Sequence, residues 1–352
     1  MSLMRAKKLK NNLITYGIVI AAYILFQALL SAGALSSLLK GLLVPICVYI
    51  TLAISLNLVV GISGELSLGH AGFMCVGAFS GAFFSKCVQE SITVSPLRLL
   101  LAMVIGAAVA AVFGLLIGIP VLRLKGDYLA IVTLAFGEII KNVINIFYIG
   151  RDSTGFHMSI KDQFSTGMAV DGKMIVNGPQ GINGTPKDAT LLAGVLLILV
   201  TLFIVLNLID SRDGRAIMSI RDNRIASESI GINITKYKLM AFTVSAALAG
   251  AAGALYAHNL ATLQASKFNY NTSILVLVFV VLGGIGNIRG SIIAAAVLTA
   301  LPELLRGLSG YRMLIYSIIL IAMMIFNWAP AVLEWRERHF GKLFRRHGKE
   351  AE

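Results

Sequence analysis

Residues 97–122 read LRLLLAMVIGAAVAAVFGLLIGIPVL, an apolar run that contains a single charged side chain, Arg98. A helix of about 20 apolar residues crosses a bilayer, because the hydrocarbon core is about 30 Å thick and a helix rises about 1.5 Å per residue. This run is therefore long enough to span a membrane. The run indicates a membrane protein, because helices in soluble domains are usually shorter and carry polar residues on one face.

The composition extends this interpretation to all 352 residues. Hydrophobic residues make up 57% of the chain and charged residues 13%, whereas soluble domains are about 45–50% apolar and about 25% charged. The net charge of +13 does not require a nucleic-acid partner, because basic residues collect at the cytoplasmic ends of membrane spans. Cys47, Cys75 and Cys87 show no metal-ligand spacing, so we expect buried thiols and no metal site.

Ten apolar runs are candidates for membrane spans, and we expect an all-α membrane protein with about ten transmembrane helices. The runs are residues 13–35, 42–60, 66–85, 97–122, 128–149, 190–209, 239–260, 274–285, 292–305 and 314–328. The eighth and ninth are short for a full crossing, which predicts broken or tilted helices.

The basic residues predict the orientation of the spans. An even number of spans places both termini on one side, and 19 of the 30 Lys and Arg residues then fall in the segments on that side. We therefore expect both termini in the cytoplasm. The first run is also longer than the apolar region of a signal peptide, which favours an uncleaved first span. The predicted parts are a basic N-terminus (1–12), a permease domain (13–335) with an outer loop (150–189) and a cytoplasmic segment (211–238), and a basic tail (336–352).

Several function classes lose support from motifs that the sequence lacks. The chain has no G-x-x-x-x-G-K-[ST] loop for nucleotide phosphates, no HExxH or GxSxG motif, and no TVGYG-like selectivity filter. We therefore expect no catalytic residues in this chain, and transport is the remaining class.

The first informative motif is GISGELSLGHAGF, residues 61–73, which interrupts an otherwise apolar sequence. Non-helical backbone at membrane depth must lie against protein or a water-lined cavity. The motif therefore predicts either residues that line a pathway or a cytoplasmic turn followed by a close-packed helix. We expect Ser63 or Ser67 to cap the helix that resumes.

A second interruption, VLGGIGNIRGS at residues 281–291, resembles the first. Glycine-interrupted segments in the two halves of a transporter often lie at its binding site. Glu138 lies inside a predicted span, and we expect Lys141, one turn later, to neutralise it. The candidate pathway residues are Asn57, Gly64, Glu65, Ser67, His70, Glu138, Gly283, Gly284 and Asn287.

The segment SRDGRAIMSIRDNRIASESIGINITKYK, residues 211–238, is too polar to span a membrane. Its pattern predicts a helix over residues 215–230, with Gly231 as the stop. Such an exposed amphipathic helix is either a membrane-surface helix or a docking element for a partner. The mixed charges of Arg215, Asp222 and Glu228 favour docking.

Five ordered blocks between about residues 57 and 302 resemble a known family. The blocks GISGELSLGHAGFMCVGAF, LRLKGDYLAIVTLAFGEIIK, NGPQGI, IRDNRIASESIGINITKYKLMAFTVSAALAGAAGALYA and VLGGIGNIRGSIIAAA are similar to those of LivM-type permeases of the LivH/LivM family. These are membrane subunits of bacterial ATP-binding cassette importers for branched-chain amino acids.

The resemblance implies a complex in the bacterial cytoplasmic membrane. Its expected members are a LivH-type second permease, two cytoplasmic ATPases that bind ATP and Mg, and a periplasmic binding protein, all in contact with membrane lipid. The implied ATPase-coupling residues are Arg221, Asp222, Arg224, Ala226, Glu228 and Gly231. The Glu-Ala-Ala of the general importer signature aligns here with Ile225-Ala226-Ser227, and its glycine with Gly231.

Two alternatives remain open. Urea and short-amide importers have closely related permeases, so the resemblance leaves the ligand undecided. A secondary transporter that uses Glu65, His70 or Glu138 as a proton or ion site is the other class; it would transport alone and without ATP.

Overall fold

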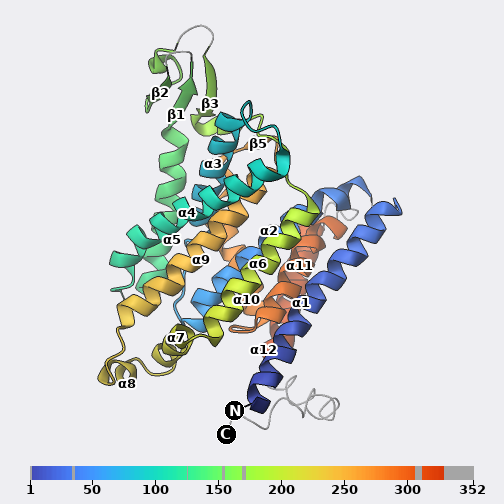
Figure 1. Cartoon of the computed structure of the whole chain (residues 1–352), viewed down its shortest axis with the longest axis vertical. Helices are drawn as coiled ribbons and strands as arrows, with labels where there is room; N and C mark the ends of the chain where they lie inside the picture. Colours follow the sequence, from blue (N-terminus) through green and yellow to red (C-terminus); the bar gives the residue numbers. More distant parts are fainter. Residues whose placement is uncertain are drawn as a thin grey trace. The chain divides into compact units, whose positions relative to one another are not determined.

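The computed structural model describes residues 2–328 apart from 34–35, 125, 153–154, 169–171 and 306–310 (Figure 1). The predicted tail, residues 336–352, lies outside this part. The chain divides into two units, residues 1–296 and 297–352, and each is described by itself.

Among the residues that the structure describes, eight helices are long and apolar enough to cross a membrane, and they coincide with the first eight predicted runs. They are α1 (Ser2–Ser31), α2 (Ser37–Asn57), α3 (His70–Val88), α4 (Ser95–Val121), α5 (Asp127–Ile146), α6 (Leu191–Asp210), α9 (Ile234–Ala257) and α10 (Tyr270–Gly283). The ninth and tenth runs are also helical, as α11 (Ile288–Leu304) and α12 (Arg312–Trp328), with 17 residues each. The all-α membrane fold is therefore confirmed.

The eighth span has the broken form that its short apolar run predicts. Its regular helix, α10, has only 14 residues, and a 3₁₀ turn, η4 (Ala265–Lys267), precedes it. The polar sequence between the turn and the helix includes Asn269, whose side chain caps α10 by accepting a hydrogen bond from the amide of Thr272.

The centre of the first unit is the mutual packing of α3, α4 and α9. Small residues allow these helices to approach closely, as in other membrane bundles. A Cβ atom at Gly77 would overlap the backbone of Gly250, and one at Gly250 would lie 2.5 Å from the carbonyl oxygen of Gly106. Small residues on all three helices therefore fix the crossing.

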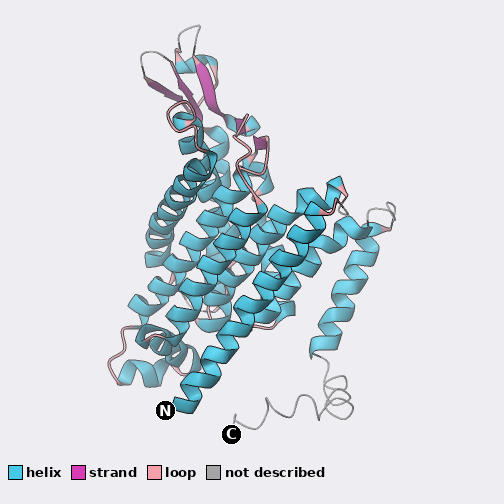
Figure 2. Ribbon diagram, turned by 45° about the vertical axis from the view of Figure 1, so that its right-hand side comes forward, coloured by secondary structure: helices cyan, strands magenta, loops and turns pink. Residues whose placement is uncertain are grey.

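Short strands form at one end of the helices, in and beside the predicted outer loop (Figure 2). The first sheet is antiparallel in the order β2-β1-β3, from β1 (Tyr148–Arg151), β2 (Phe156–Ser159) and β3 (Lys173–Asn177). The second sheet pairs β4 (Ile182–Asn183) with β5 (Thr262–Leu263). No sequence pattern predicted these strands, because each is only two to five residues long.

Contacts between distant segments support the predicted alternation of spans. On one side, the 61–69 turn contacts both the 211–238 segment and the turn before α11, through Gly61–Arg221 and Gly61–Gly286. On the other side, Lys86 at the end of α3 donates to the carbonyl of Asn183 in β4. The assignment of the first side to the cytoplasm stays a prediction from the basic residues.

Candidate functional site

The segment of residues 211–238 folds mainly as two short helices, α7 (Arg212–Asp222) and α8 (Arg224–Ser229). The prediction of one helix over residues 215–230 is therefore wrong. The break is at Asn223, whose backbone is extended (φ −152°, ψ 103°) and whose Oδ1 accepts a 3.0 Å hydrogen bond from the amide of Ala226. Asparagine is a strong N-cap residue, so it starts a new helix where a single one would otherwise continue.

The α8 helix is almost entirely exposed. Of residues 224–230 only Ser227 is buried, while Ile225 and Ile230 are 81% and 75% exposed. Arg224, Ala226 and Glu228, predicted to couple to an ATPase, are exposed on the same short helix. Two large apolar side chains beside charged ones on a surface helix are typical of a docking element.

Gly231 lies just after the end of α8 and stops the helix, as predicted. Its φ is +84°, a left-handed conformation that glycine adopts without strain. Its amide donates to the carbonyl of Glu228 at 3.0 Å, and the next amide, of Ile232, donates to the carbonyl of Ser227 at 3.1 Å. These two bonds satisfy carbonyl groups that the end of a helix leaves free.

The α7 helix attaches the segment to the membrane helices. Ile217 and Ile220 are buried, and Arg221 at its end reaches the 61–69 turn. The Nη1 of Arg221 donates to the carbonyl oxygen of Gly61 at 2.9 Å. The Nε and Nη2 of the same guanidinium donate to Oδ1 of Asp222 at 3.0 and 2.9 Å, which holds the side chain in this orientation.

The first glycine motif is a true break between α2 and α3. The α2 helix ends in a π-helical turn, η1 (Leu58–Ile62), and residues 63–69 are not helical. Gly64 has a φ of +72°, and a Cβ there would lie 2.6 Å from Cγ of Arg221. The turn is therefore shaped to receive the stem of Arg221.

The expected serine cap of α3 is wrong. The N-cap residue is Gly69, with no side-chain hydrogen bond, and Oγ of Ser67 is buried without a hydrogen-bond partner. A Cβ at Gly69 would lie 2.5 Å from the carbonyl oxygen of Thr133. Close contact with α5 therefore selects glycine at the position where a serine cap would otherwise be favourable.

Asn57 joins the two glycine motifs. Its side chain is fully buried; Nδ2 donates to Oγ of Ser291 at 2.9 Å, and Oδ1 accepts from the amide of Gly286 at 2.9 Å. The sequence suggested that the two interruptions resemble each other, and the structure brings them into contact. Sequence reasoning had no signal for this pairing, since 229 residues separate Asn57 from Gly286.

The second interruption is a tight joint between α10 and α11. Gly284 and Gly286 have φ values of +94° and +82°. A Cβ at Gly283 would overlap the backbone of Gly290. Asn287 is exposed, and its Oδ1 accepts from the amide of Gly290 at 3.3 Å. Glycine is therefore required here for conformation and for close approach.

The other candidate pathway residues have partners inside the chain. Glu65 forms an ion pair with Lys238 of α9, and Glu138 forms the predicted pair with Lys141. The second oxygen of Glu138 accepts a 3.0 Å hydrogen bond from the amide of Tyr270, the first residue of α10. A carboxylate at a helix N-terminus is favourable, so Glu138 ties α5 to α10.

His70 is buried at the start of α3. Its Nε2 lies 2.7 Å from Oγ of Ser55 on α2. The carbonyl of Ser55 in turn accepts a 2.5 Å hydrogen bond from Oγ of Ser245 on α9. His70 thus belongs to a polar contact among three helices.

A second feature, which sequence reasoning missed, is a buried ion pair on the side of the helices where the short strands lie. Arg98, near the start of α4, donates from Nε and Nη2 to the two carboxylate oxygens of Asp188, each at 2.8 Å. The two side chains are 8% and 7% exposed. The single charge in the run of residues 97–122 was the signal, because a charge in a span normally has a partner.

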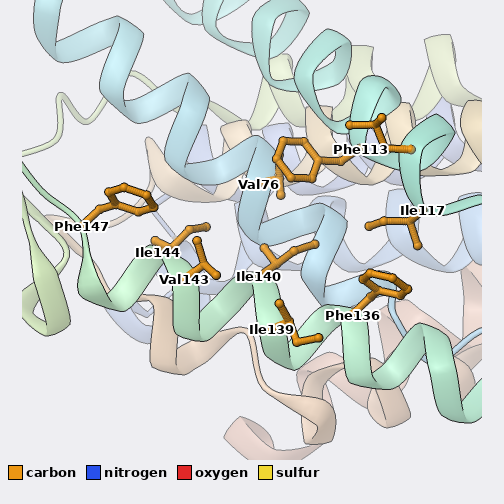
Figure 3. A pocket seen from close by; sticks show the side chains of 10 residues that line it. Val76, Phe113, Ile117, Phe136, Ile139, Ile140, Val143, Ile144 and Phe147 are labelled. Atoms are coloured by element: carbon orange, nitrogen blue, oxygen red, sulfur yellow. The ribbon is translucent and has the colours of Figure 1, made fainter. Parts of the chain in front are cut away.

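An apolar groove of about 420 Å³ lies among α3, α4 and α5 (Figure 3). Its ten lining residues, which include Val76, Phe113 and Phe136, are all aliphatic or aromatic. A zwitterionic ligand would lose its hydration there without gaining hydrogen bonds. The groove therefore does not suit an amino acid.

Comparison with known proteins places this geometry in a family. A family model described as "Branched-chain amino acid transport system / permease component" matches residues 38–327. The chain belongs to this permease family. The match includes both glycine interruptions and the exposed α7–α8 segment.

Individual relatives agree with the family. The chain is 37% identical over 293 residues to the high-affinity branched-chain amino acid transport system permease protein LivM of Salmonella typhimurium, and 36% identical over 292 residues to that of Escherichia coli. Both alignments cover 80% of this chain and 67% of the relative. The nucleoside ABC transporter permease protein NupC of Lactococcus lactis is 24% identical over 60% of this chain and 62% of its own length. No solved structure matches.

Proposed function

We propose that this chain is a permease subunit of an ATP-driven importer in the bacterial cytoplasmic membrane. It works with a second permease, two cytoplasmic ATPases and an external binding protein. The match of the family model over residues 38–327 carries the proposal. The exposed α8 helix supports it, because an ATPase that lies outside the membrane needs a surface of the permease to push against.

Branched-chain amino acids are the proposed ligands, because both LivM relatives carry this ligand in their names at 36–37% identity. A nucleoside importer is the second candidate, since the more distant NupC relative shows that similar permeases carry other cargo. In either case hydrolysis of ATP takes place on the partner ATPases, and this chain supplies the route through the membrane.

Movement of α7 and α8 is the proposed link between hydrolysis and transport. When the ATPases approach each other, they displace the exposed α8, and α7 carries the displacement to the membrane helices. The candidate pathway residues, including Glu65, His70 and Glu138, then change their packing as the helices move. The alternation between inward-open and outward-open states follows from this rearrangement.

Co-purification tests the proposal. The chain is extracted from native membranes in mild detergent, its partners are identified by mass spectrometry, and ATP hydrolysis is measured with the binding protein and candidate ligands. We expect a second permease and ATPases, and hydrolysis that rises with leucine, isoleucine or valine. A rise with nucleosides, urea or an amide instead keeps the importer and replaces the ligand. Purification of the chain alone, with ATP-independent transport, contradicts the proposal.

A further inference from the structure

We infer that Arg221, Gly61 and Asn57 form one connection, which carries movement of α7 and α8 to the joint between α10 and α11. We name it the Arg221–Asn57 connection. It makes Asn57 a positioning residue for transport. The inference rests on the proposed function, because it assigns the internal part of the coupling between the ATPases and the membrane helices.

The connection begins at Arg221. The carbonyl of Gly61 lies at the end of η1, where helix carbonyls lack partners in their own helix. The guanidinium occupies this position at 2.9 Å, and a cation at a helix C-terminus is favourable. The stem of the same side chain lies against Gly64. A displacement of α7 is therefore transmitted to the turn both by the hydrogen bond and by direct contact.

The second step passes through Gly61 itself. The space beside its Cα is filled by Oδ1 of Asn57 and by the backbone of Gly286, so that a Cβ would overlap both. Packing of this closeness cannot absorb a shift without moving its neighbours. A shift of the Gly61 backbone is therefore passed on to the turn before α11.

The third step links Asn57 to the turn before α11 and to α11 itself. Asn57 is fully buried, and it holds the amide of Gly286 and the hydroxyl of Ser291, each at 2.9 Å. A buried polar group that loses its partner is costly, so these bonds are kept while the backbone moves. Gly284 and Gly286, with positive φ values, supply a backbone that can rotate between the two helices.

The test uses the whole importer in proteoliposomes, with uptake of leucine and hydrolysis of ATP measured together. In Arg221→Gln we expect normal co-purification and substantial hydrolysis, but at least about a tenfold loss of leucine taken up per ATP, as expected for a coupling of typical strength. Arg215→Gln is the matched control, because it removes the same charge from the same helix, and Arg215 donates to the carbonyl oxygen of Asp210, outside the Arg221–Asn57 connection. Uptake per ATP equal to wild type in Arg221→Gln overturns the inference.

The role of Asn57 is tested by combination. In Asn57→Ala we expect the same type of loss, and the double variant with Arg221→Gln should lose no more than the more severe single variant, because both act on one connection. If Asn57→Ala does not fold, Ser291→Ala takes its place, since it removes only one of the two bonds of Asn57. Losses that multiply in the double variant contradict a shared connection.

Hydrogen exchange separates transmission from a purely local structural role. In the wild-type complex, trapping the ATPases in a transition-state-like form should change the exchange of amides in residues 283–291. In trapped Arg221→Gln these amides should keep their resting exchange. An equal change in both complexes overturns the inference. Failure of the wild-type chain to co-purify with ATPases is a different result, which overturns the proposed function itself.

Discussion

Gly61 has almost no space for a larger side chain. Its backbone carbonyl accepts from Arg221, and the space beside its Cα is occupied by Asn57 and Gly286. Any larger side chain must displace either a buried amide or the backbone of another segment. Close packing therefore restricts position 61 to glycine.

A first prediction follows for Gly61→Ala. The added methyl group should destabilise the protein by about 1–3 kcal/mol, the usual cost of overpacking a close-packed site. Gly17→Ala in α1 is the control, because nothing lies within 4 Å of a Cβ at that position. Thermal unfolding in detergent, followed by size-exclusion chromatography, measures both. Equal unfolding temperatures for the two variants would contradict the close packing.

A second prediction concerns the buried pair of Arg98 and Asp188. Asp188→Asn removes one charge and leaves the other buried at 8% exposure, which should cost about 3–5 kcal/mol. Glu90→Gln is the control, because its pair with Lys173 is 3.9 Å long and its side chain is 91% exposed. A surface pair of this kind is worth about 0–1 kcal/mol. The same thermal assay applies, and similar effects of the two variants would argue against the buried pair.

At the scale of the element, the position of α8 in the segment of residues 211–238 depends on how this helix ends. Gly231→Ala places a Cβ in a left-handed conformation, at a cost of about 1–2 kcal/mol, although the space around it is open. We expect α8 to lose its fixed position and uptake per ATP to fall. Asparagine tolerates this conformation better, so Gly231→Asn should restore part of the uptake. Equal uptake by Gly231→Ala and wild type would show that the turn is not needed.

The elements also show what sequence can predict. Spans are predictable because apolar length is a local property, and each of the ten runs contains a helix in the structure. The break at residues 63–69 was predictable for the same reason, since glycine and polar residues of the 61–73 motif interrupt the apolar run. The partner of Asn57 was not, because Gly286 and Ser291 lie more than 200 residues away and no local pattern encodes the contact.

The two helices of residues 211–238 show a different limit of prediction from sequence. The pattern of residues 215–230 is helical throughout, and the competing effect of a single cap at Asn223 decides the break. The assignment of site residues has a similar limit. An acidic residue in a membrane span marks a functional position. The local i,i+3 spacing predicted the partner of Glu138, which is Lys141, but only the fold shows that Glu65 pairs with Lys238.

At the scale of the whole molecule, the described part of the chain combines two features with separate tasks. One is a bundle in which α3, α4 and α9 pack closely on one another. The other is the segment of residues 211–238, which is exposed on α8 and contacts the 61–69 turn through Arg221. An exposed helix attached to a close-packed bundle fits the proposed importer, in which partner ATPases drive the movement from outside the membrane.

The decisive measurement is uptake of labelled leucine into proteoliposomes that contain either the assembled complex or this chain alone. We predict that the complex takes up leucine only when ATP and the loaded binding protein are both present, and that the chain alone takes up none under a proton or sodium gradient. Gradient-driven uptake by the chain alone, unaffected by ATP, would contradict the account.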